Sequence, residues 1–593
     1  GVQTCALPIC ISSGNIDNTS WTYPEKLPSG ATTYTPVAPY KDSNSVSAGG
    51  YTWGMLADNA FYYWVTDLQP SIPNDVPSYM PDPTPHPLTN KTEDNPRNDP
   101  ATWQHMVTFT VGFGVDGKIP INDANYQDLL DGSISWSSNK IDDLWHTAIN
   151  SRGQFFNAKS PQEMIDGFAA ALSDVLERTA SGSAVAMNAG ELDANARLYQ
   201  ALFNSGSWSG QLLAFKLDTV TGAVITPEVW DAAQLLTTRI AGTGWDSNRV
   251  VITYDGTTGI PFRWGSLSTA LKTEITANVP SVKSAQGQAR LQYLRGSETD
   301  EGVNGNGYRS RATKLGDIVD SSPIFVGDPQ FNHPDTLESQ PYSSFRSSVS
   351  GRQAMLYVGA NDGMLHGFDA ATGEERLAYV PREVFPNLAR LLAPAYAHTF
   401  YVNGTPTAGD VFFGGAWHTV LVGGLRKGGQ GIYALDVTDP ANFSESNAST
   451  IALWEFTDAN DADLGYTFSR PAVVRMANGK WAAVFGNGYN NTVADGNAST
   501  SGNAVLYIVD IENGSLLKKI DTGVGRAQDP TATLTPNGLA TVSPVDVNGD
   551  RIADYVYGGD LFGNLWKFDV TDADPANWGK AYGGSPLFVA MDG

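Results

Sequence analysis

Leu506-Tyr507-Ile508-Val509-Asp510, followed by a turn that contains Glu512-Asn513-Gly514, is the stretch that decides the fold. It joins an apolar run, typical of a buried strand, to a terminal Asp and a Gly-containing turn. The same pattern recurs at Leu365-His366-Gly367-Phe368-Asp369, Ile432-Tyr433-Ala434-Leu435-Asp436 and Leu565-Trp566-Lys567-Phe568-Asp569. The terminal Asp residues of successive copies are 67, 74 and 59 residues apart. That spacing accommodates four strands and their loops, which is the unit of a β-propeller blade.

A degenerate fifth copy lies upstream, at Leu213-Ala214-Phe215-Lys216-Leu217-Asp218. A Gly-containing strand, such as Leu356-Tyr357-Val358-Gly359, usually precedes each copy. We interpret the Asp that ends each repeated strand as the cap of an Asx-turn and not as a metal ligand. The sequence therefore predicts a β-propeller over residues 181–593.

A second informative stretch is Asp546-Val547-Asn548-Gly549-Asp550-Arg551-Ile552-Ala553-Asp554. Side chains that carry oxygen occupy positions 1, 3, 5 and 9, and the carbonyl of Ile552 is available at position 7. Ca²⁺ takes about six to eight oxygen ligands, and a curled loop can deliver several of them. Three carboxylates so close together would repel one another without a cation between them. We predict a calcium site formed by Asp546, Asn548, Asp550, Asp554 and the Ile552 carbonyl; the alternative is a hairpin turn without metal.

The flanks of this loop differ from those of an EF-hand, which has a helix on each side. Residues 539–545 before the loop and residues 555–559 after it are predicted to be short strands. Arg551 stands where calcium loops usually have Gly, and its charge should weaken the affinity for calcium somewhat.

Composition limits the possible functions. The chain has 593 residues, of which 41% are hydrophobic and 17% charged, with 61 Gly, 15 Trp and 24 Tyr, and this suits turn-rich β structure. The net charge of −25 argues against nucleic acid as a partner, because a backbone binder needs clustered Lys and Arg. No run of about 18 apolar residues occurs, so no transmembrane segment is predicted.

The two cysteines, Cys5 and Cys10, lie in the first ten residues, so a disulfide framework or Cys-based zinc site is excluded elsewhere. The chain begins at Gly1, and its first ten residues resemble a translated sequencing adaptor more than a protein. We therefore expect a fragment whose signal peptide is missing, with residues 1–10 artefactual. The strand predicted at residues 587–590 is expected to be cut short.

The first 180 residues have a different pattern. Helices are predicted at residues 51–67, 141–149 and 161–178, the last with Ser160 as its N-cap, and a buried strand at residues 107–111. Residues 69–100 are rich in Pro, Asn and Asp and are predicted to be a surface insertion. This succession suggests the closing half of an α/β domain over residues 1–180.

Taken together, these landmarks resemble the type IV pilus biogenesis and tip-adhesin family, the PilY/PilC-type proteins. The resemblance rests on Leu56-Ala57-Asp58 with Tyr63-Trp64, residues 107–114, Ile141-Asp142-Asp143-Leu144-Trp145-His146, Asn150-Ser151-Arg152-Gly153, Tyr293-Leu294-Arg295-Gly296, residues 315–323, residues 464–469, and the calcium loop continuing through residues 558–566. It covers nearly the whole chain.

The resemblance implies a mainly β fold, in which a calcium-binding propeller follows a partial α/β domain like von Willebrand factor A. It also implies a protein that reaches the pilus tip and outer-membrane surface through the periplasm. There such proteins promote pilus assembly, oppose retraction, and bind host surfaces, with minor pilins as partners. The Asp-x-Ser-x-Ser loop of von Willebrand adhesion sites is missing, since Asp42-Ser43-Asn44-Ser45-Val46 fails at its third and fifth positions. That loop normally follows the first strand, which this fragment is expected to have lost, so the sequence supports no metal claim for the first domain.

Parts of the sequence also resemble two other classes of protein. A quinoprotein dehydrogenase is suggested by Gly359-Ala360-Asn361-Asp362-Gly363, but its cofactor usually lies over a vicinal disulfide, and the propeller region has no cysteine. A generic integrin-like calcium propeller explains the Asp-rich loop but not the first domain. The histidines are scattered, and His146 and His366, within apolar patterns, are predicted to be packed and hydrogen-bonded rather than ligands. The prediction is a protein that is not an enzyme.

Overall fold

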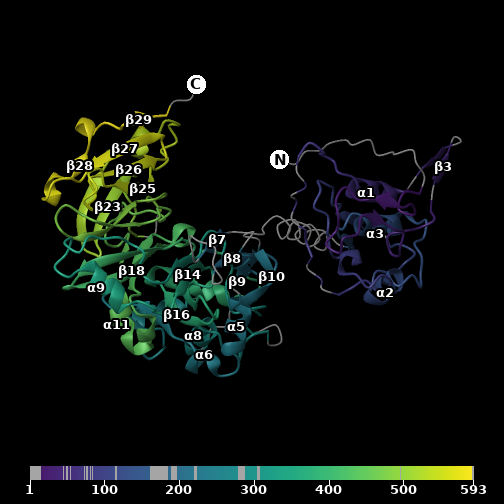
Figure 1. Ribbon diagram of the computed structural model, residues 1–593, viewed down its shortest axis with the longest axis horizontal. Coiled ribbons are helices and arrows are strands. Elements are labelled where there is room, and N and C mark those ends of the chain that lie inside the picture. The colour runs from purple at the N-terminus through teal and green to yellow at the C-terminus, as the bar shows by residue number, and fades with distance from the viewer. Residues whose placement is uncertain are drawn as a thin grey trace. The chain divides into compact units, whose positions relative to one another are not determined.

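The computed structural model describes residues 15–590 except 45, 49–50, 54, 73, 75, 77, 81, 83, 114–115, 160–183, 188–195, 220–223, 278–286, 303–306 and 494–495. The chain divides into two compact units, Gly1–Thr179 and Ala180–Gly593 (Figure 1). We call them unit 1 and unit 2 and describe each by itself. None of the described helices is long and apolar enough to span a membrane.

The described part of unit 2 contains five successive sheets, each built on four antiparallel strands, and the repeated strand is the third of these four. The first sheet is β7 (Ala184–Met187), β8 (Arg197–Asn204), β9 (Ser209–Leu217) and β10 (Val224–Asp231); the third is β17 (Thr407–Phe413), β18 (Ala416–Gly424), β19 (Gly431–Asp436) and β20 (Ala452–Thr457); the fourth is β21 (Ala472–Arg475), β22 (Trp481–Gly486), β23 (Val505–Asp510) and β24 (Leu516–Asp521). Because the copies ending at Asp369, Asp436 and Asp510 lie in separate sheets, the interpretation of the repeat as a blade is confirmed.

The second and fifth sheets carry additional strands. The second comprises β13 (Ile324–Val326), β14 (Met355–Ala360), β15 (Met364–Asp369) and β16 (Glu375–Val380), extended by β11 (Val251–Tyr254), which runs parallel to β16, and β12 (Gly259–Pro261). The fifth comprises β25 (Leu539–Val545), β26 (Tyr555–Asp560), β27 (Asn564–Asp569) and β28 (Gly579–Lys580), with β29 (Phe588–Val589) also paired to β27.

Neighbouring sheets pack face to face, and the alternation of side chains along each strand supplies both faces. In β23, Tyr507 and Val509 join a core shared with the third sheet, whereas Leu506 and Ile508 join a core shared with the fifth. All six residues of β23 are buried, because neighbours cover both faces of its sheet. Successive sheets follow one another through unit 2, from β8 and β9 in teal to β26 and β27 in yellow (Figure 1).

Short helices fill the connections of unit 2. The α-helices are α5 (Ala232–Arg239), α6 (Gly244–Ser247), α7 (Thr269–Ile275), α8 (Gly287–Arg295), α9 (Tyr342–Ser348), α10 (Phe385–Leu388) and α11 (Ala448–Ile451). The 3₁₀ turns are η2 (Arg382–Val384), η3 (Ala389–Leu392), η4 (Arg426–Gly428), η5 (Pro440–Asn442), η6 (Glu445–Asn447), η7 (Arg526–Gln528), η8 (Pro575–Asn577) and η9 (Tyr582–Gly584).

Unit 1 combines helices with short strands: β1 (Trp21–Thr22), β2 (Thr33–Tyr34), β3 (Val46–Ala48), β4 (Tyr51–Trp53), α1 (Leu56–Val65), η1 (Thr92–Asp94), β5 (Thr110–Phe113), α2 (Asp123–Leu130), α3 (Lys140–Asn150) and β6 (Phe155–Ala158). Helices α1 and α3 pack side by side (Figure 1), and β5 pairs in parallel with β6. The core is aromatic, with Phe61, Trp64 and Trp103 fully buried. This is an α/β arrangement, and its likeness to von Willebrand factor A remains a prediction.

Two element boundaries in unit 1 were predicted wrongly. Helix α1 begins at Leu56 and not at residue 51, because residues 51–53 form a hairpin strand. The Asp58 carboxylate accepts the N–H of Met55 at 2.7 Å, which fixes the start of the helix. Strand β5 begins at Thr110 and not at residue 107, because the backbone N–H of Thr108 donates to the Ser151 hydroxyl instead of a strand partner. The predicted helix at residues 161–178 lies outside the described residues.

Candidate functional site

The predicted calcium loop, residues 546–554, connects β25 to β26, as the sequence indicated. The two strands pair up to the edge of the loop, with Val545 opposite Tyr555. A backbone hydrogen bond of 2.9 Å from Asp554 N to the Val545 carbonyl closes its base. The nine residues thus form the loop of a β-hairpin, whereas the calcium loop of an EF-hand lies between two helices.

Side-chain oxygens inside the loop accept backbone N–H groups and so curl the chain. Asp546 accepts from Gly549 at 2.7 Å through Oδ1 and from Arg551 at 2.8 Å through Oδ2. Asp554 Oδ2 reaches back to the Val547 N–H at 2.8 Å. The Oδ1 atoms of Asn548 and Asp550 each accept the N–H two residues further on, at 2.9 and 2.8 Å. These bonds turn the loop back on itself and set the directions of four of the predicted ligands.

The backbone enters the left-handed region twice within the loop. Gly549 has φ of +83°, which glycine adopts without steric cost. Arg551 has φ of +70°, which is unfavourable for a residue with a Cβ atom. The position that calcium loops usually give to Gly is therefore one where this backbone also favours Gly.

The end of the loop is attached to the neighbouring fourth sheet. Ile552 forms an isolated bridge with Arg475, the last residue of β21, and the Ala553 N–H donates to the Arg475 carbonyl at 2.9 Å. Ala553 is buried, whereas residues 547–551 are exposed. The loop thus has a fixed end at the joint between two sheets and a solvent-exposed tip.

The donor set fits a hard cation. Three carboxylates, an amide oxygen and a backbone carbonyl offer oxygen alone, as Ca²⁺ prefers. A carboxylate oxygen that accepts one N–H keeps a lone pair for a metal. Partial burial raises the pKa of Asp546, but the N–H groups of Arg551 and Gly549 outweigh it and lower that pKa overall. The three carboxylates do not offer oxygens that all lie within 4.8 Å of one another, so the loop is more open than a closed coordination shell. The calcium site stays a prediction.

The Asp residues that end the repeated strands have a different role, which the sequence predicted correctly. Oδ1 of Asp369 accepts the N–H of Ala371 at 2.7 Å, and Oδ1 of Asp510 accepts that of Glu512 at 3.0 Å. Asp436 and Asp569 make the same contact with the residue two positions on, at 2.9 and 3.1 Å. All four cap Asx-turns.

His366 is packed and hydrogen-bonded, as expected. Its Nδ1 lies 2.8 Å from a Glu375 oxygen, and its Nε2 lies 3.1 Å from the Asp362 carboxylate. Glu375 also accepts from Arg249 at 2.7 Å, which completes a buried network. His146 is also buried, and its ring stacks on Trp136 with centroids 4.5 Å apart.

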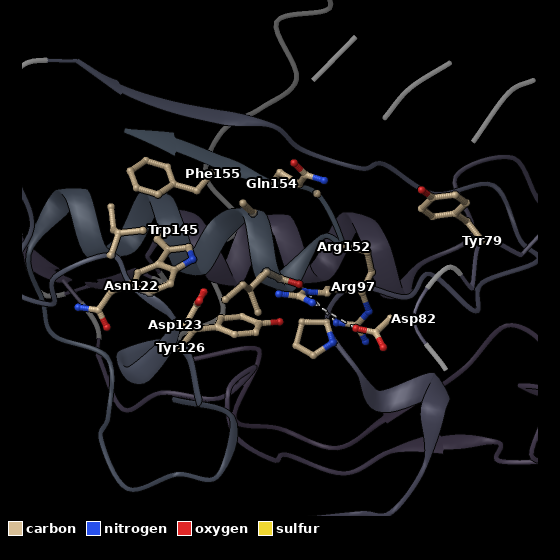
Figure 2. A pocket seen from close by; sticks show the side chains of 15 residues that line it. Tyr79, Asp82, Arg97, Asn122, Asp123, Tyr126, Trp145, Arg152, Gln154 and Phe155 are labelled. Carbon is tan, nitrogen blue, oxygen red and sulfur yellow. Dashed lines mark hydrogen bonds and ion pairs between the residues drawn. The ribbon is translucent and has the colours of Figure 1, made fainter. Parts of the chain in front are cut away.

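A pocket in unit 1 was not predicted from the sequence. It has a volume of about 720 Å³ and lies beside α3, which contributes Trp145 (Figure 2). Arg97 lies over the Tyr126 ring at 5.4 Å and pairs with Asp82 at 3.4 Å. The wall of the pocket also includes Tyr79, Asn122, Asp123, Arg152, Gln154 and Phe155 (Figure 2). These residues come from separate segments, so no local motif could have indicated the pocket.

Comparison with known proteins gives a family to the part of unit 2 that begins just before β13. A model of the PilY1 beta-propeller domain matches residues 315–590, which include the calcium loop and four of the terminal Asp residues. The type IV pilus biogenesis factor PilY1 of Pseudomonas aeruginosa PAO1 is 39% identical over 633 residues. The alignment covers 98% of this chain and 50% of that protein. This chain belongs to the PilY1 family.

Other members of the PilY1 family are similar over shorter stretches. A PilY1 homologue of Xylella fastidiosa Temecula1 is 42% identical over 320 residues, which are 51% of this chain and 21% of that protein. The crystal structure of the Pseudomonas aeruginosa PilY1 C-terminal domain matches with 41% identity and a TM-score of 0.37, covering 45% of this chain and 53% of that one. The chain spans about half the length of the Pseudomonas relatives. The resemblance identified from the sequence is thus confirmed at the level of the family.

Proposed function

We propose that this chain is part of a calcium-dependent protein of type IV pilus assembly that also controls retraction and adheres at the pilus tip. The observation that carries this proposal is the 39% identity to a PilY1 biogenesis factor along 98% of the chain. The matched segment includes both units and the Asp-rich loop. By this proposal the protein acts at the outer-membrane surface and pilus tip, which it reaches through the periplasm.

The predicted ion is calcium, and its proposed effect is local. The loop extends from a hairpin whose strands are already paired, and Ala553 ties it to the fourth sheet at 2.9 Å. Calcium would therefore order the tip at residues 547–551 and leave the sheets as they are. A change confined to an exposed tip can alter partner binding without unfolding the propeller. This is how calcium would switch pilus extension and retraction.

The proposed partners are minor pilins at the pilus tip and a host-surface receptor. The test is a pull-down of purified minor pilins by the immobilised chain, in buffer with calcium and in buffer with a calcium chelator. We expect calcium-dependent capture by the wild type, and capture by Asp554→Ala at the level of the chelated sample. Asp572→Ala removes an exposed Asp from the connection between β27 and β28, outside the loop, and serves as the matched control. Equal capture by all samples would contradict the calcium switch; absence of capture would contradict the choice of partner.

We further propose that the chain is not an enzyme. The nearest alternative, a quinoprotein dehydrogenase, would hold its cofactor over a vicinal disulfide, and residues 11–593 contain no cysteine. Stoichiometric binding of a quinone cofactor together with dye-linked alcohol oxidation would overturn this proposal.

A further inference from the structure

Three side chains from distant segments of unit 1 meet in its interior. Asp17 precedes β1, Asp42 precedes β3, and His146 lies on α3. Each offers one ligand atom, and these atoms all lie within 4.8 Å of one another, the one such group of three His, Cys, Asp or Glu side chains among the described residues. The side chains of Asp17, Asp42 and His146 are 0%, 4% and 1% exposed. Bulk water therefore does not solvate the two carboxylates.

The imidazole ring of His146 is held in one orientation. Its Nε2 lies 2.8 Å from the carbonyl oxygen of Tyr40, and because a carbonyl can only accept, Nε2 must carry the hydrogen. The Trp136 ring stacks on the imidazole with an interplanar angle of 16° and blocks rotation. In a neutral imidazole the other nitrogen, Nδ1, is then an acceptor with a free lone pair.

This Nδ1 atom faces a second acceptor. It lies 3.4 Å from Asp42 Oδ2 and makes no hydrogen bond to any described residue. An imidazole lone pair and a carboxylate oxygen directed at each other in a buried place repel unless a cation or a proton lies between them. The geometry therefore leaves a position for a positive charge.

Neutral donors already orient both carboxylates. Asp17 accepts the Asp42 N–H at 3.2 Å and the Asn150 amide at 2.9 Å. Asp42 accepts the N–H of Asn44 at 2.8 Å and the side-chain amide of Asn15 at 3.1 Å. Within the described part of the chain, neither carboxylate pairs with a Lys or Arg. Among the described residues, His146 is the one base in contact with both carboxylates. The Asp58 carboxylate adds negative charge nearby, since its Oδ1 accepts the Asp17 N–H at 3.3 Å.

We propose that Asp17, Asp42 and His146 form a buried site for a divalent transition-metal ion, with zinc as the favoured ion and His146 as a ligand through Nδ1. Metal-binding histidines usually donate their other ring N–H to a carbonyl or carboxylate, and here Tyr40 accepts it. Bonds of about 2.0–2.1 Å in a tetrahedral shell place neighbouring ligand atoms about 3.3 Å apart. The 3.4 Å between Nδ1 and Asp42 Oδ2 agrees with that separation, and Asp17 Oδ2 lies 3.6 Å from the Nε2 of the same ring.

The mixed donor set selects the metal. An imidazole nitrogen beside two carboxylates suits zinc or manganese better than calcium, which prefers oxygen alone. A candidate for the fourth ligand is Oδ1 of Asn150, which is buried without a partner among the described residues, while the nitrogen of the same amide donates to Asp17 at 2.9 Å. That oxygen, or a water bound to it, can complete the shell.

The proposed metal would join segments that have little regular structure of their own. Residues 15–44 contain two strands of two residues each, and the cluster ties both ends of this segment to α3. The same helix contributes Trp145 to the pocket of unit 1 (Figure 2). Binding would therefore stabilise unit 1 and fix the wall of that pocket.

The test uses the purified full chain, stripped of metal and titrated with zinc chloride by calorimetry, with bound metal counted by mass spectrometry. Cys5→Ser and Cys10→Ser are introduced in every sample, so that thiolates cannot bind the zinc. We expect one zinc per chain, at least tenfold weaker binding in Asp42→Asn and in His146→Gln, and a rise in unfolding temperature with zinc in the parent alone. His418→Gln is the matched control, since His418 also pairs with an Asp, at 2.7 Å, but is partly exposed.

The outcomes separate the proposal from its alternative, a doubly protonated His146 between two carboxylates without metal. Binding of zinc by the parent would support the site if the X-ray absorption spectrum of the bound zinc shows nitrogen and oxygen ligands and no sulfur. Failure of the parent to bind zinc or manganese at micromolar concentration would overturn it, as would equal affinity in Asp42→Asn. Because Asn keeps the shape of Asp, the Asp42→Asn variant decides the question if His146→Gln does not fold.

Discussion

The predicted calcium loop and the proposed metal site of unit 1 would hold a cation in opposite ways. In the loop, the five predicted ligands lie within nine consecutive residues at an exposed tip. In the cluster, three ligands come from positions as far apart as 17 and 146 and are almost completely buried. A local loop can lose its ion and keep its fold, because the hairpin beneath it supplies the structure. A buried cluster cannot, because its charges are part of the core.

The largest expected effect comes from breaking the cluster. His146→Ala removes the imidazole that contacts two buried carboxylates, and with it the proposed metal ligand, so we expect unit 1 to lose about 3–5 kcal/mol of stability. Hydrogen exchange measured peptide by peptide should show faster exchange across α1 and α3 and unchanged exchange in β22 and β23. Unchanged protection of α3 would mean that the cluster does not contribute to the core.

Removal of a loop ligand should have a smaller effect that depends on calcium. Wild-type unit 2 should gain about 2.7 kcal/mol when free calcium is a hundred times the dissociation constant. Asp554→Ala should lose this gain and keep the circular dichroism of the sheets, while Asp572→Ala should keep both. The measurement is thermal unfolding with and without calcium. If Asp554→Ala binds calcium as tightly as the wild type, the assigned site is wrong; if the variant does not fold, calcium is structural and does not act as a switch.

Arg551 allows charge and backbone strain in the loop to be separated. Arg551→Gly removes a cation and also relieves the φ of +70°, which costs a residue with a Cβ atom about 1 kcal/mol or more. Arg551→Ala removes the cation alone. We expect calcium to bind several times more tightly to both variants, and Arg551→Gly to be the more stable by about 1 kcal/mol. Calorimetric titration and urea unfolding measure the two effects. Identical stability of the two variants would mean that position 551 is not strained.

The smallest effect is expected at an Asp that is not a ligand. Asp569→Asn keeps the side-chain oxygen that accepts the Thr571 N–H at 3.1 Å, so stability should change by less than about 0.5 kcal/mol. Calcium affinity should also be unchanged. Weaker calcium binding by this variant would place a second ion, or part of the first, at the strand ends and contradict the Asx-turn role.

The repeat could be recognised from the sequence because each repeated strand is an apolar run that ends in Asp. Alternate residues of β23 face two different cores, so the whole strand must be apolar, and this produces a run that is recognisable without neighbours. The start of helix α1 in unit 1 was harder to predict from the sequence. Residues 51–53 continue the helical spacing of apolar residues found in α1, but they pair with β3. The spacing of apolar residues along the chain does not show that a segment has a strand partner.

The sequence alone determined the propeller strands, the Asx-turns and the position of the Asp-rich loop between β25 and β26, because each depends on residues that are neighbours in the chain. The tertiary structure alone decided the pocket beside α3 and the meeting of Asp17, Asp42 and His146. The sequence supported no metal claim for the first domain, because its one recognisable signal, a contiguous Asp-x-Ser-x-Ser loop, is missing from the chain. His146 looks like any packed histidine until Tyr40 fixes which ring nitrogen carries the hydrogen. A site whose residues are neighbours in the chain can be recognised from their spacing. A buried site made of distant residues exists only after long-range packing has brought its atoms together.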